Sequence, residues 1–293
     1  MAAVGVVVSA LSREGLTVLG SGDTTQISLE DPLAMRHVIR DGGFDEIYYL
    51  AAHHHSSEDD LGLTAELVRR SFAVHVDGLL NILDAMVACV PKARLFYAAS
   101  SHIFGVVSGS PQTEETPLRP ICVYGITKSA GVELCRLFRQ QHGVFASVGI
   151  LYNHESPRRG PSFLSRKVAR AVVEIERGAR ASLVLGDLDA RTDWGYAPEY
   201  VEAMRRILAL EQSGDFVISS GRAESVREFV AAAFGQAGLD WTKYVRVDRT
   251  VDRKAKRGLL VGDPGKVARL TGWSARTSVQ DLARLMVDAE RSV

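Results

Sequence analysis

Tyr124 and Lys128 are the residues of this sequence whose types and spacing most directly indicate chemistry. They form the pattern Y-x-x-x-K, which places two side chains one turn apart on the same face of a helix. An ammonium group beside a phenol stabilises the phenolate and lowers the pKa of the phenol, so the pair can act as a general base on a hydroxyl group. The pattern also occurs by chance in many helices. Its setting favours catalysis, because the hydroxyl residues Ser100 and Ser101 end an apolar run upstream.

A second polar group lies in the segment LYNHESPRRG at 151–160. It brings the amide of Asn153, the imidazole of His154 and the guanidinium groups of Arg158 and Arg159 into a few positions. A polar run of this kind can be an ordinary loop after a strand. Forked guanidinium groups also bind phosphate, through charge-assisted hydrogen bonds worth roughly 1.5 to 3 kcal/mol each. The segment is therefore a candidate binding site for an anionic ligand.

The composition is that of an ordinary globular chain. It has 293 residues, of which 46% are hydrophobic and 24% charged, enough for one large domain with a smaller lobe. Lysine plus arginine equals aspartate plus glutamate at 35 each, so the overall charge does not favour a nucleic acid partner. The three cysteines lack C-x-x-C pairing, and the N-terminus lacks a leader-like pattern, which favours the cytoplasm. We expect no membrane partner, because no apolar run approaches the length of a membrane span.

Apolar runs alternate with helical patterns along the first half of the chain. The sequence predicts strands at 45–51, 94–100 and 145–152, with helices at about 64–90 and 128–143 between them. This order predicts an α/β fold with a doubly wound, mostly parallel, Rossmann-like sheet and helices on both faces. Ligands of such sheets bind beyond the carboxyl ends of the strands. The polar segments HHHSSEDD, SSHIFG and NHESPRRG follow the three strands, so we expect them to meet there.

The second half of the chain predicts a smaller C-terminal α/β substrate lobe that is interleaved with the first domain. The expected elements are a helix at 165–178, a strand at SLVLGD, a helix at 197–212, a strand at 215–220 and a helix at 225–238. Ser225 and Glu228 have the spacing of a capping box at the start of the last helix. We assign residues 1–153 and 190–213 to the Rossmann-like dinucleotide-binding domain, and residues 154–189 and 214–293 to the lobe.

The N-terminal region lacks a feature that this fold calls for. Nucleotide-binding sheets open with a strand and a turn such as G-x-G-x-x-G, whose glycines let a pyrophosphate approach the backbone at a helix N-terminus. Residues 1–44 contain no such turn. The elements expected there are strands near 4–11 and 25–29 and a helix at about 31–41. Either the sequence begins inside a longer protein, or the chain has given up its dinucleotide cofactor.

Three consecutive histidines, His53, His54 and His55, raise the question of a metal site. Successive side chains of an extended segment point alternately to opposite sides, so these three rings do not converge on one ion. We therefore predict that the protein has no metal site.

Several further segments occur together in this sequence. They are ILYNHESPRRG, SRK, LVLGDLDARTDWGYAPEYVEAM, DFVISSG, SVREFV, and LLVGDPGK with TGW. In this combination the chain resembles the GDP-mannose 4,6-dehydratase family of extended short-chain dehydrogenases, from about residue 45 to the C-terminus. The resemblance implies a lyase that uses NADP to convert GDP-mannose, or a related GDP-sugar, to its 4-keto-6-deoxy form. It also implies a homodimer or homotetramer.

The same resemblance implies roles for individual residues. Ser100, Tyr124 and Lys128 would hold and deprotonate the reacting hydroxyl, and His102 lies where the family has its catalytic glutamate. The substrate-binding residues implied are Asn153, Arg158, Arg159, Arg166, Lys167, Arg191, Arg253 and His54. The cofactor-binding residues implied are Ala51, Ala52, Tyr124, Lys128, Asn153 and His154.

The sequence departs from the family at positions close to this chemistry. His102 replaces the glutamate, Thr192 replaces an arginine next to Arg191, and Ser28 replaces an aspartate near the adenine. The stretch VVVSALSRE has no match to the family's arginine-rich segment. An imidazole can shuttle protons, but its place at 102 leaves open a GDP-sugar C4 epimerase or oxidoreductase. A non-catalytic nucleotide-sugar-binding homologue without a cofactor site is the alternative from another class.

Overall fold

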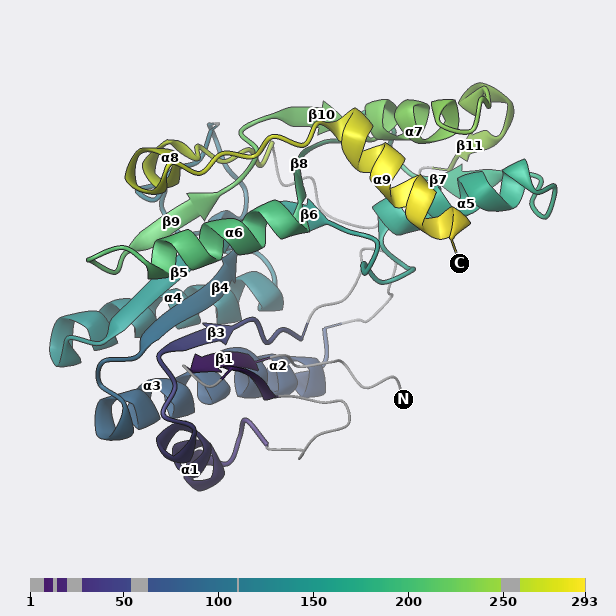
Figure 1. Cartoon of the computed structure of the whole chain (residues 1–293). Coiled ribbons are helices and arrows are strands. Elements are labelled where there is room, and N and C mark those ends of the chain that lie inside the picture. Colours follow the sequence, from purple (N-terminus) through teal and green to yellow (C-terminus); the bar gives the residue numbers. More distant parts are fainter. Residues whose placement is uncertain are drawn as a thin grey trace.

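The computed structural model of the chain describes residues 8–12, 15–19, 28–53, 63–109, 111–248 and 259–292. Its largest sheet has six strands in the order β2-β1-β3-β4-β5-β9 (Figure 1). The strands are β1 (Val8–Ser12), β2 (Gly15–Leu19), β3 (Glu46–Tyr49), β4 (Arg94–Ser100), β5 (Phe145–Leu151) and β9 (Asp215–Ile218). Strands β3, β4, β5 and β9 pair in parallel, which confirms the predicted α/β fold with a mostly parallel sheet.

Helices bury both faces of this sheet, as predicted. Along β4, Tyr97 and Ala99 pack into the core on one face, whereas Phe96 and Ala98 pack into the core on the other, because successive strand side chains alternate. The first face is covered by α1 (Pro32–Gly42), α2 (Ala65–Phe72), α3 (Gly78–Cys89) and α4 (Val123–His142). The second is covered by α6 (Ala197–Leu208) and α8 (Gly265–Thr271).

The N-terminal strands differ from the predicted arrangement. β1 and β2 form an antiparallel hairpin, and β1 also pairs antiparallel with β3. β1 overlaps the strand expected near 4–11. Residues 25–27 of the strand expected at 25–29 lie outside the described residues, and residues 28 and 29 are not in a strand. The helix expected at about 31–41 is confirmed as α1. Asp31 caps this helix by accepting hydrogen bonds from the N–H groups of Leu33 and Ala34, both at 3.0 Å.

Residues 65–89 form one continuous helix made of α2, the π-helical turn η1 (Ala73–Asp77) and α3. Within the described part of the chain it is the one helix long and apolar enough to cross a membrane by length and composition. The expectation that no segment approaches that length is therefore wrong. Leu79, Ile82, Leu83 and Met86 of this helix are buried in the core against the sheet, and this packing accounts for the apolar composition.

A second, smaller α/β unit lies beside the large sheet (Figure 1). It contains a three-stranded sheet in the order β10-β8-β6 and a two-stranded sheet of β11 and β7. Its elements are β6 (Asn153–Glu155), α5 (Leu164–Glu176), β7 (Leu183–Leu185), β8 (Arg191–Tyr196), β10 (Ala223–Ser225), α7 (Val226–Gly235), the short 3-10 helix η3 (Trp241–Lys243), β11 (Val245–Val247) and α9 (Val279–Arg291). In its core Trp194 stacks on Phe229 with ring centroids 4.9 Å apart. Ser225 and Glu228 form the predicted capping box at the start of α7.

The boundaries between the large domain and the lobe differ from the predicted ones. β9 and α8 lie in the range 214–293 assigned to the lobe, yet β9 pairs with β5 and α8 packs against β9 and α6. β8 lies in the range 190–213 assigned to the large domain, yet it pairs with β6 and β10. Strand partners are distant in sequence, so local patterns place a strand without saying which sheet receives it.

Candidate active site

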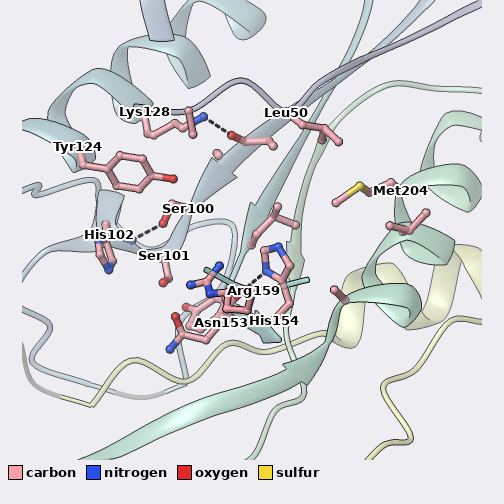
Figure 2. Close-up of a pocket in the computed structure, with 17 residues that line it drawn as sticks. Leu50, Ser100, Ser101, His102, Tyr124, Lys128, Asn153, His154, Arg159 and Met204 are labelled. Atoms are coloured by element: carbon pink, nitrogen blue, oxygen red, sulfur yellow. Dashed lines mark hydrogen bonds between the residues drawn. The ribbon is translucent and has the colours of Figure 1, made fainter. Parts of the chain in front are cut away.

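The carboxyl ends of β4 and β5 open into a cavity of about 360 Å³. Figure 2 shows side chains from the end of β4, from α4 and from the segment after β5 pointing into it. The predicted site residues that line it are Ala52, Ser100, His102, Tyr124, Lys128, Asn153, His154 and Arg159. Leu50, Ala98, Leu151 and Met204 supply an apolar wall. The polar segments after β4 and β5 therefore converge at one edge of the sheet, as the strand order predicts.

Ser100 reaches the cavity because the chain turns sharply after β4. It is the last residue of β4 and the N-cap of the short 3-10 helix η2 (Ser101–Phe104). Its hydroxyl accepts a hydrogen bond from the N–H of His102 at 3.3 Å. Gly105 ends η2 with φ of 63°, a backbone conformation that favours glycine. This turn brings the side chains of Ser100 and His102 to the same cavity.

Tyr124 and Lys128 lie on the first turns of α4 and both face the cavity, as the Y-x-x-x-K spacing predicts. Lys128 is buried, and its Nζ donates hydrogen bonds to the carbonyl oxygens of Ala51 at 3.2 Å and Ala98 at 2.8 Å. The same Nζ lies 5.9 Å from the centroid of the Tyr124 ring. Lys128 thus anchors the helix to the ends of two strands, and Ala51 contributes through its carbonyl.

The electrostatics of Tyr124 differ from the simple expectation that Lys128 lowers the pKa of the phenol. Burial raises the pKa of Tyr124 to about 12, while a side-chain hydrogen bond with Ser100 and the charge of Arg159 lower it in part. Burial also lowers the pKa of Lys128 to about 7. At that pKa about half of the Lys128 amines are charged at neutral pH. Ser100 and Arg159 are the groups that lower the pKa of Tyr124 and so favour its phenolate.

Two imidazole rings flank Tyr124 at their edges. The His102 ring centroid lies 5.6 Å from that of Tyr124 at an interplanar angle of 85°. The His75 ring centroid lies 5.3 Å away at 82°. His75 is fully buried beneath the site and was not among the predicted residues. Its sequence signal is one histidine in the apolar helical run FAVHVDGLL, which by itself fits a core residue.

Arg159 is held in place by contacts on two sides. Its Nε lies 3.2 Å from Glu155 Oε2, close enough for an ion pair but without the alignment of a hydrogen bond. The Ser165 hydroxyl donates a hydrogen bond to the same carboxylate oxygen at 2.6 Å. The Arg159 guanidinium carbon lies 3.8 Å from the centroid of the Phe163 ring. These contacts orient the guanidinium toward the cavity, where Figure 2 shows it near Asn153.

Asn153 and His154 line the cavity beside Arg159. The Asn153 amide donates a hydrogen bond to the Thr192 hydroxyl at 2.5 Å. His154 Nδ1 lies 2.8 Å from the carbonyl oxygen of Tyr152, and its ring stacks on Tyr200 with centroids 5.0 Å apart. Burial lowers the pKa of His154. The neutral imidazole donates its Nδ1 proton to this carbonyl, which leaves Nε2 as an acceptor.

Four predicted substrate-binding residues do not line this cavity. Arg158 is exposed, and Lys167 is partly buried on α5. Arg166 donates hydrogen bonds to Glu290 at 2.7 Å and to the carbonyl of Arg159 at 2.8 Å. Arg191 is exposed and bonds the carbonyl of Ala223. In Arg166 and Arg191, nearby protein acceptors bind the guanidinium donors that were expected to bind a ligand.

Two further predicted residues, His54 and Arg253, lie outside the described residues, as does His55. His53 is described: its backbone N–H donates to His75 Nε2 at 2.8 Å, and its Nδ1 lies 3.4 Å from the Ser71 hydroxyl. Across the described ranges, no group of three or more histidine, cysteine, aspartate or glutamate side chains is placed to hold a metal ion.

A serine, a tyrosine and a lysine that meet beyond the strands of a Rossmann-like sheet define the short-chain dehydrogenase/reductase class. RMD from Pseudomonas aeruginosa complexed with NADPH has a TM-score of 0.81 and 21% identity, over 93% of this chain and 89% of that one. UDP-glucose 4-epimerase from Thermotoga maritima with UDP-glucose has a TM-score of 0.79 and 20% identity, over 92% and 84% of the two chains. At these identities the likeness shows the fold.

The sequence comparisons identify the family. The profile of the family described as GDP-mannose 4,6 dehydratase matches residues 13–286. GDP-mannose 4,6 dehydratase 2 of Arabidopsis thaliana is 36% identical over 250 residues, which are 84% of this chain and 65% of that protein. GDP-mannose 4,6 dehydratase of Dictyostelium discoideum is 34% identical over 296 residues, covering 94% and 80%. The chain belongs to the GDP-mannose 4,6-dehydratase family, which confirms the resemblance found in the sequence. The chain spans about two thirds (65%) of the length of the Arabidopsis relative.

Proposed function

We propose that this chain is a nicotinamide-dependent lyase that converts GDP-mannose, or a related GDP-sugar, to its 4-keto-6-deoxy form. The observation that carries the proposal is the meeting of Ser100, Tyr124 and Lys128 in one cavity with Arg159 and Asn153. The first three suit the oxidation of a sugar hydroxyl, and the last two suit an anionic, hydroxyl-rich substrate. The family relatives are named for this activity.

The reactive end of the cavity fits a nicotinamide cofactor. The small side chains of Ala52 and Ala98 leave room beside the strand ends, next to Tyr124 and Lys128. Ala52, Tyr124, Lys128 and His154 would hold the cofactor. When bound, it would accept a hydride from C4 of the sugar and later return one to C6. The family resemblance and the NADPH in the Pseudomonas aeruginosa structure support NADP as this cofactor.

Tyr124 removes the proton of the sugar 4-hydroxyl in this mechanism. Its pKa of about 12 is high for a base at neutral pH, so the proton transfer depends on groups that stabilise the phenolate. Ser100 does so through its hydrogen bond and Arg159 through its charge. Lys128, with a pKa of about 7, lies under Tyr124 in the same cavity, where it can exchange a proton near neutral pH.

Arg159 and Asn153 orient the substrate. Glu155 and Phe163 fix the guanidinium before any ligand arrives, so little side-chain freedom is lost on binding. The apolar wall of Leu50, Leu151 and Met204 excludes water from the reacting carbons. Loss of water across C5 and C6 needs a proton carrier, and His102, which lines the cavity beside Tyr124, would supply one.

A second candidate reaction follows from His102 itself. Its imidazole lies edge-on to Tyr124, where the family has a carboxylate. If this imidazole does not support elimination of water, the 4-keto sugar would either take a hydride back at C4, as in a C4 epimerase, or leave as the ketone together with the reduced cofactor, as in an oxidoreductase. His102→Glu separates the two, because gain of elimination in that variant supports the second reaction. A non-catalytic GDP-sugar-binding homologue would retain no nicotinamide and show neither reaction.

The remaining features of the proposal concern the protein's surroundings. We propose a homodimer or homotetramer in the cytoplasm, without nucleic acid or membrane partners. These features rest on the family resemblance, the equal numbers of basic and acidic residues and the cysteine pattern.

Mass spectrometry of a reaction with GDP-mannose and NADP tests the function directly. Loss of one water from the sugar nucleotide, abolished in Tyr124→Phe, is the expected result. A changed sugar of unchanged mass would support the epimerase, and stoichiometric NADPH formation the oxidoreductase. No reaction together with no bound cofactor would contradict both enzymatic proposals.

A further inference from the structure

His75 occupies a position that the proposed chemistry has not used. It lies in the π-helical turn η1 between α2 and α3, and it is fully buried. π-helical turns inside α-helices are uncommon and frequently mark functional sites. A buried histidine in an apolar core also calls for an explanation through its partners, because its polar nitrogens must both be satisfied.

Both ring nitrogens of His75 have partners that belong to the site. Nε2 accepts a hydrogen bond from the backbone N–H of His53 at 2.8 Å, just beyond β3. Nε2 therefore carries no proton, so in the neutral ring the proton is on Nδ1. Nδ1 lies 2.7 Å from the Thr127 hydroxyl on α4, to which it donates. Thr127 in turn donates its own proton to the carbonyl of Val123 at 3.0 Å or that of Tyr124 at 3.2 Å.

The π-turn is held against β3 by a second contact. The hydroxyl of Tyr49, the last residue of β3, donates a hydrogen bond to the carbonyl of Val74. Gly78, which follows the turn, leaves the space that this tyrosine needs, because a Cβ there would lie 2.4 Å from the Tyr49 hydroxyl. Two contacts four residues apart on the β3 side thus fix the turn, and with it the ring of His75.

The two segments joined by His75 are those on which the reaction depends. Residues 51–53 carry Ala52, which lines the cavity, and Ala51, whose carbonyl holds Lys128. Thr127 lies next to Lys128 on the helix turn that carries Tyr124. The edge-on contact of the His75 ring with Tyr124, at 5.3 Å between centroids, adds a third fixed point.

We propose that His75 is a positioning residue. As a neutral imidazole protonated on Nδ1, it fixes the end of β3 and the first turn of α4 relative to each other. It thereby sets the positions of Tyr124 and Lys128 beside the backbone that faces the cofactor. The proposal rests on the proposed function for its kinetic test. The predicted tautomer of His75 does not depend on the proposed function, because it can be measured without turnover.

The tautomer is the first test. In water a neutral histidine side chain prefers the proton on Nε2, so the arrangement inferred here leaves a distinct signature. The imidazole ¹⁵N shifts of the full chain labelled at histidine, assigned by comparison with His75→Gln, should show the Nδ1–H form for His75 at neutral pH. An Nε2–H or doubly protonated ring would overturn the proposal, whether or not the chain is active.

Two substitutions then separate the two contacts. His75→Asn keeps a donor near the place of Nδ1 and loses the acceptor for His53, so it should weaken NADPH binding about fivefold to tenfold, the size of one buried hydrogen bond, with kcat nearly unchanged. His75→Gln can keep the acceptor and loses Thr127, so it should lower kcat by a similar factor with NADPH binding nearly unchanged. His142→Asn, an exposed change at the far end of α4, is the matched control.

The pattern of results decides between positioning and simple packing. If both variants lose stability but keep the NADPH dissociation constant and kcat of the folded protein, His75 is a core residue only and the proposal is wrong. If the wild-type chain turns over no GDP-sugar, the proposed function fails, while the ¹⁵N shifts and NADPH binding still test His75.

Discussion

The two sides of the cavity are built in different ways. On the side of β4 and α4, Ser100, Tyr124 and Lys128 come from regular elements, and the side chains of Ser100 and Lys128 are hydrogen bonded to backbone groups. On the side of the segment after β6, the arginines come from a loop and the start of α5, and side-chain carboxylates compete for them. Of the four cationic residues expected there, Arg159 alone lines the cavity.

This difference teaches where spacing in a sequence predicts a site. Residues four apart at a helix start must share a face, so Tyr124 and Lys128 could be placed together without the fold. For adjacent arginines in a loop, no spacing rule predicts which way each side chain points. Arg158 and Arg159 end in different environments, because Glu155 and Phe163 are within reach of only one of them.

The largest expected effect tests the side built on regular elements. Tyr124→Phe removes the proposed base and leaves the ring in its packing between the imidazoles. We expect kcat/KM to fall by about 10² to 10⁴-fold, the range for loss of a general base, with the melting temperature nearly unchanged. Steady-state kinetics and thermal unfolding measure the two quantities. Retention of more than a tenth of the activity would show that another group takes the proton.

Lys128→Met sharpens the same comparison through stability. Burial lowers the pKa of Lys128 from 10.5 to about 7, so between these values the unfolded chain binds the extra proton and the stability of the folded protein rises with pH. Burial of the charged amine destabilises the folded protein. This cost is absent above pH 10.5 and grows as the pH falls to about 7. Urea unfolding at pH 7 to 9 should show this rise in the wild type and its loss in Lys128→Met. Parallel pH profiles would mean that the buried amine keeps its proton.

Arg159→Ala and Arg158→Ala form a matched pair on the loop side. Loss of Arg159 should raise KM for GDP-mannose about tenfold or more, from one charge-assisted contact worth roughly 1.5 to 3 kcal/mol. It should also move the pH profile of kcat/KM upward, because the cation that lowers the pKa of Tyr124 is gone. Arg158→Ala should change both by less than about twofold, as expected for an exposed side chain away from the cavity. Equal effects of the two changes would contradict the assignment.

Arg166→Ala should have the smallest effect on catalysis. This guanidinium bonds Glu290 on α9 and the carbonyl of Arg159. We expect a loss of about 1 to 3 kcal/mol in the free energy of unfolding, because Glu290 is left largely buried without its partner. The change in kcat should stay within about twofold. A large rise in KM with unchanged stability would show that Arg166 contacts the substrate after all.

The fold was predictable where long apolar runs and strict periods occur. The buried strands β3, β4 and β5 and the helices α1, α3 and α4 were expected at nearly the observed residues. β9 was expected as a strand but placed in the wrong unit, because its four buried residues fit either sheet. The antiparallel pairing of β1 with β3 was not predictable either, since both orientations satisfy the same apolar run.

The sequence by itself determined the chemistry available: a tyrosine and a lysine one helical turn apart, a serine at a strand end, and a histidine two residues after that serine. These follow from local geometry, which a few neighbouring residues dictate. The tertiary structure alone decided which cations face the cavity, that burial rather than Lys128 dominates the pKa of Tyr124, and that His75 joins β3 to α4. Those outcomes depend on contacts between residues far apart in sequence, whose burial and distance no local pattern contains.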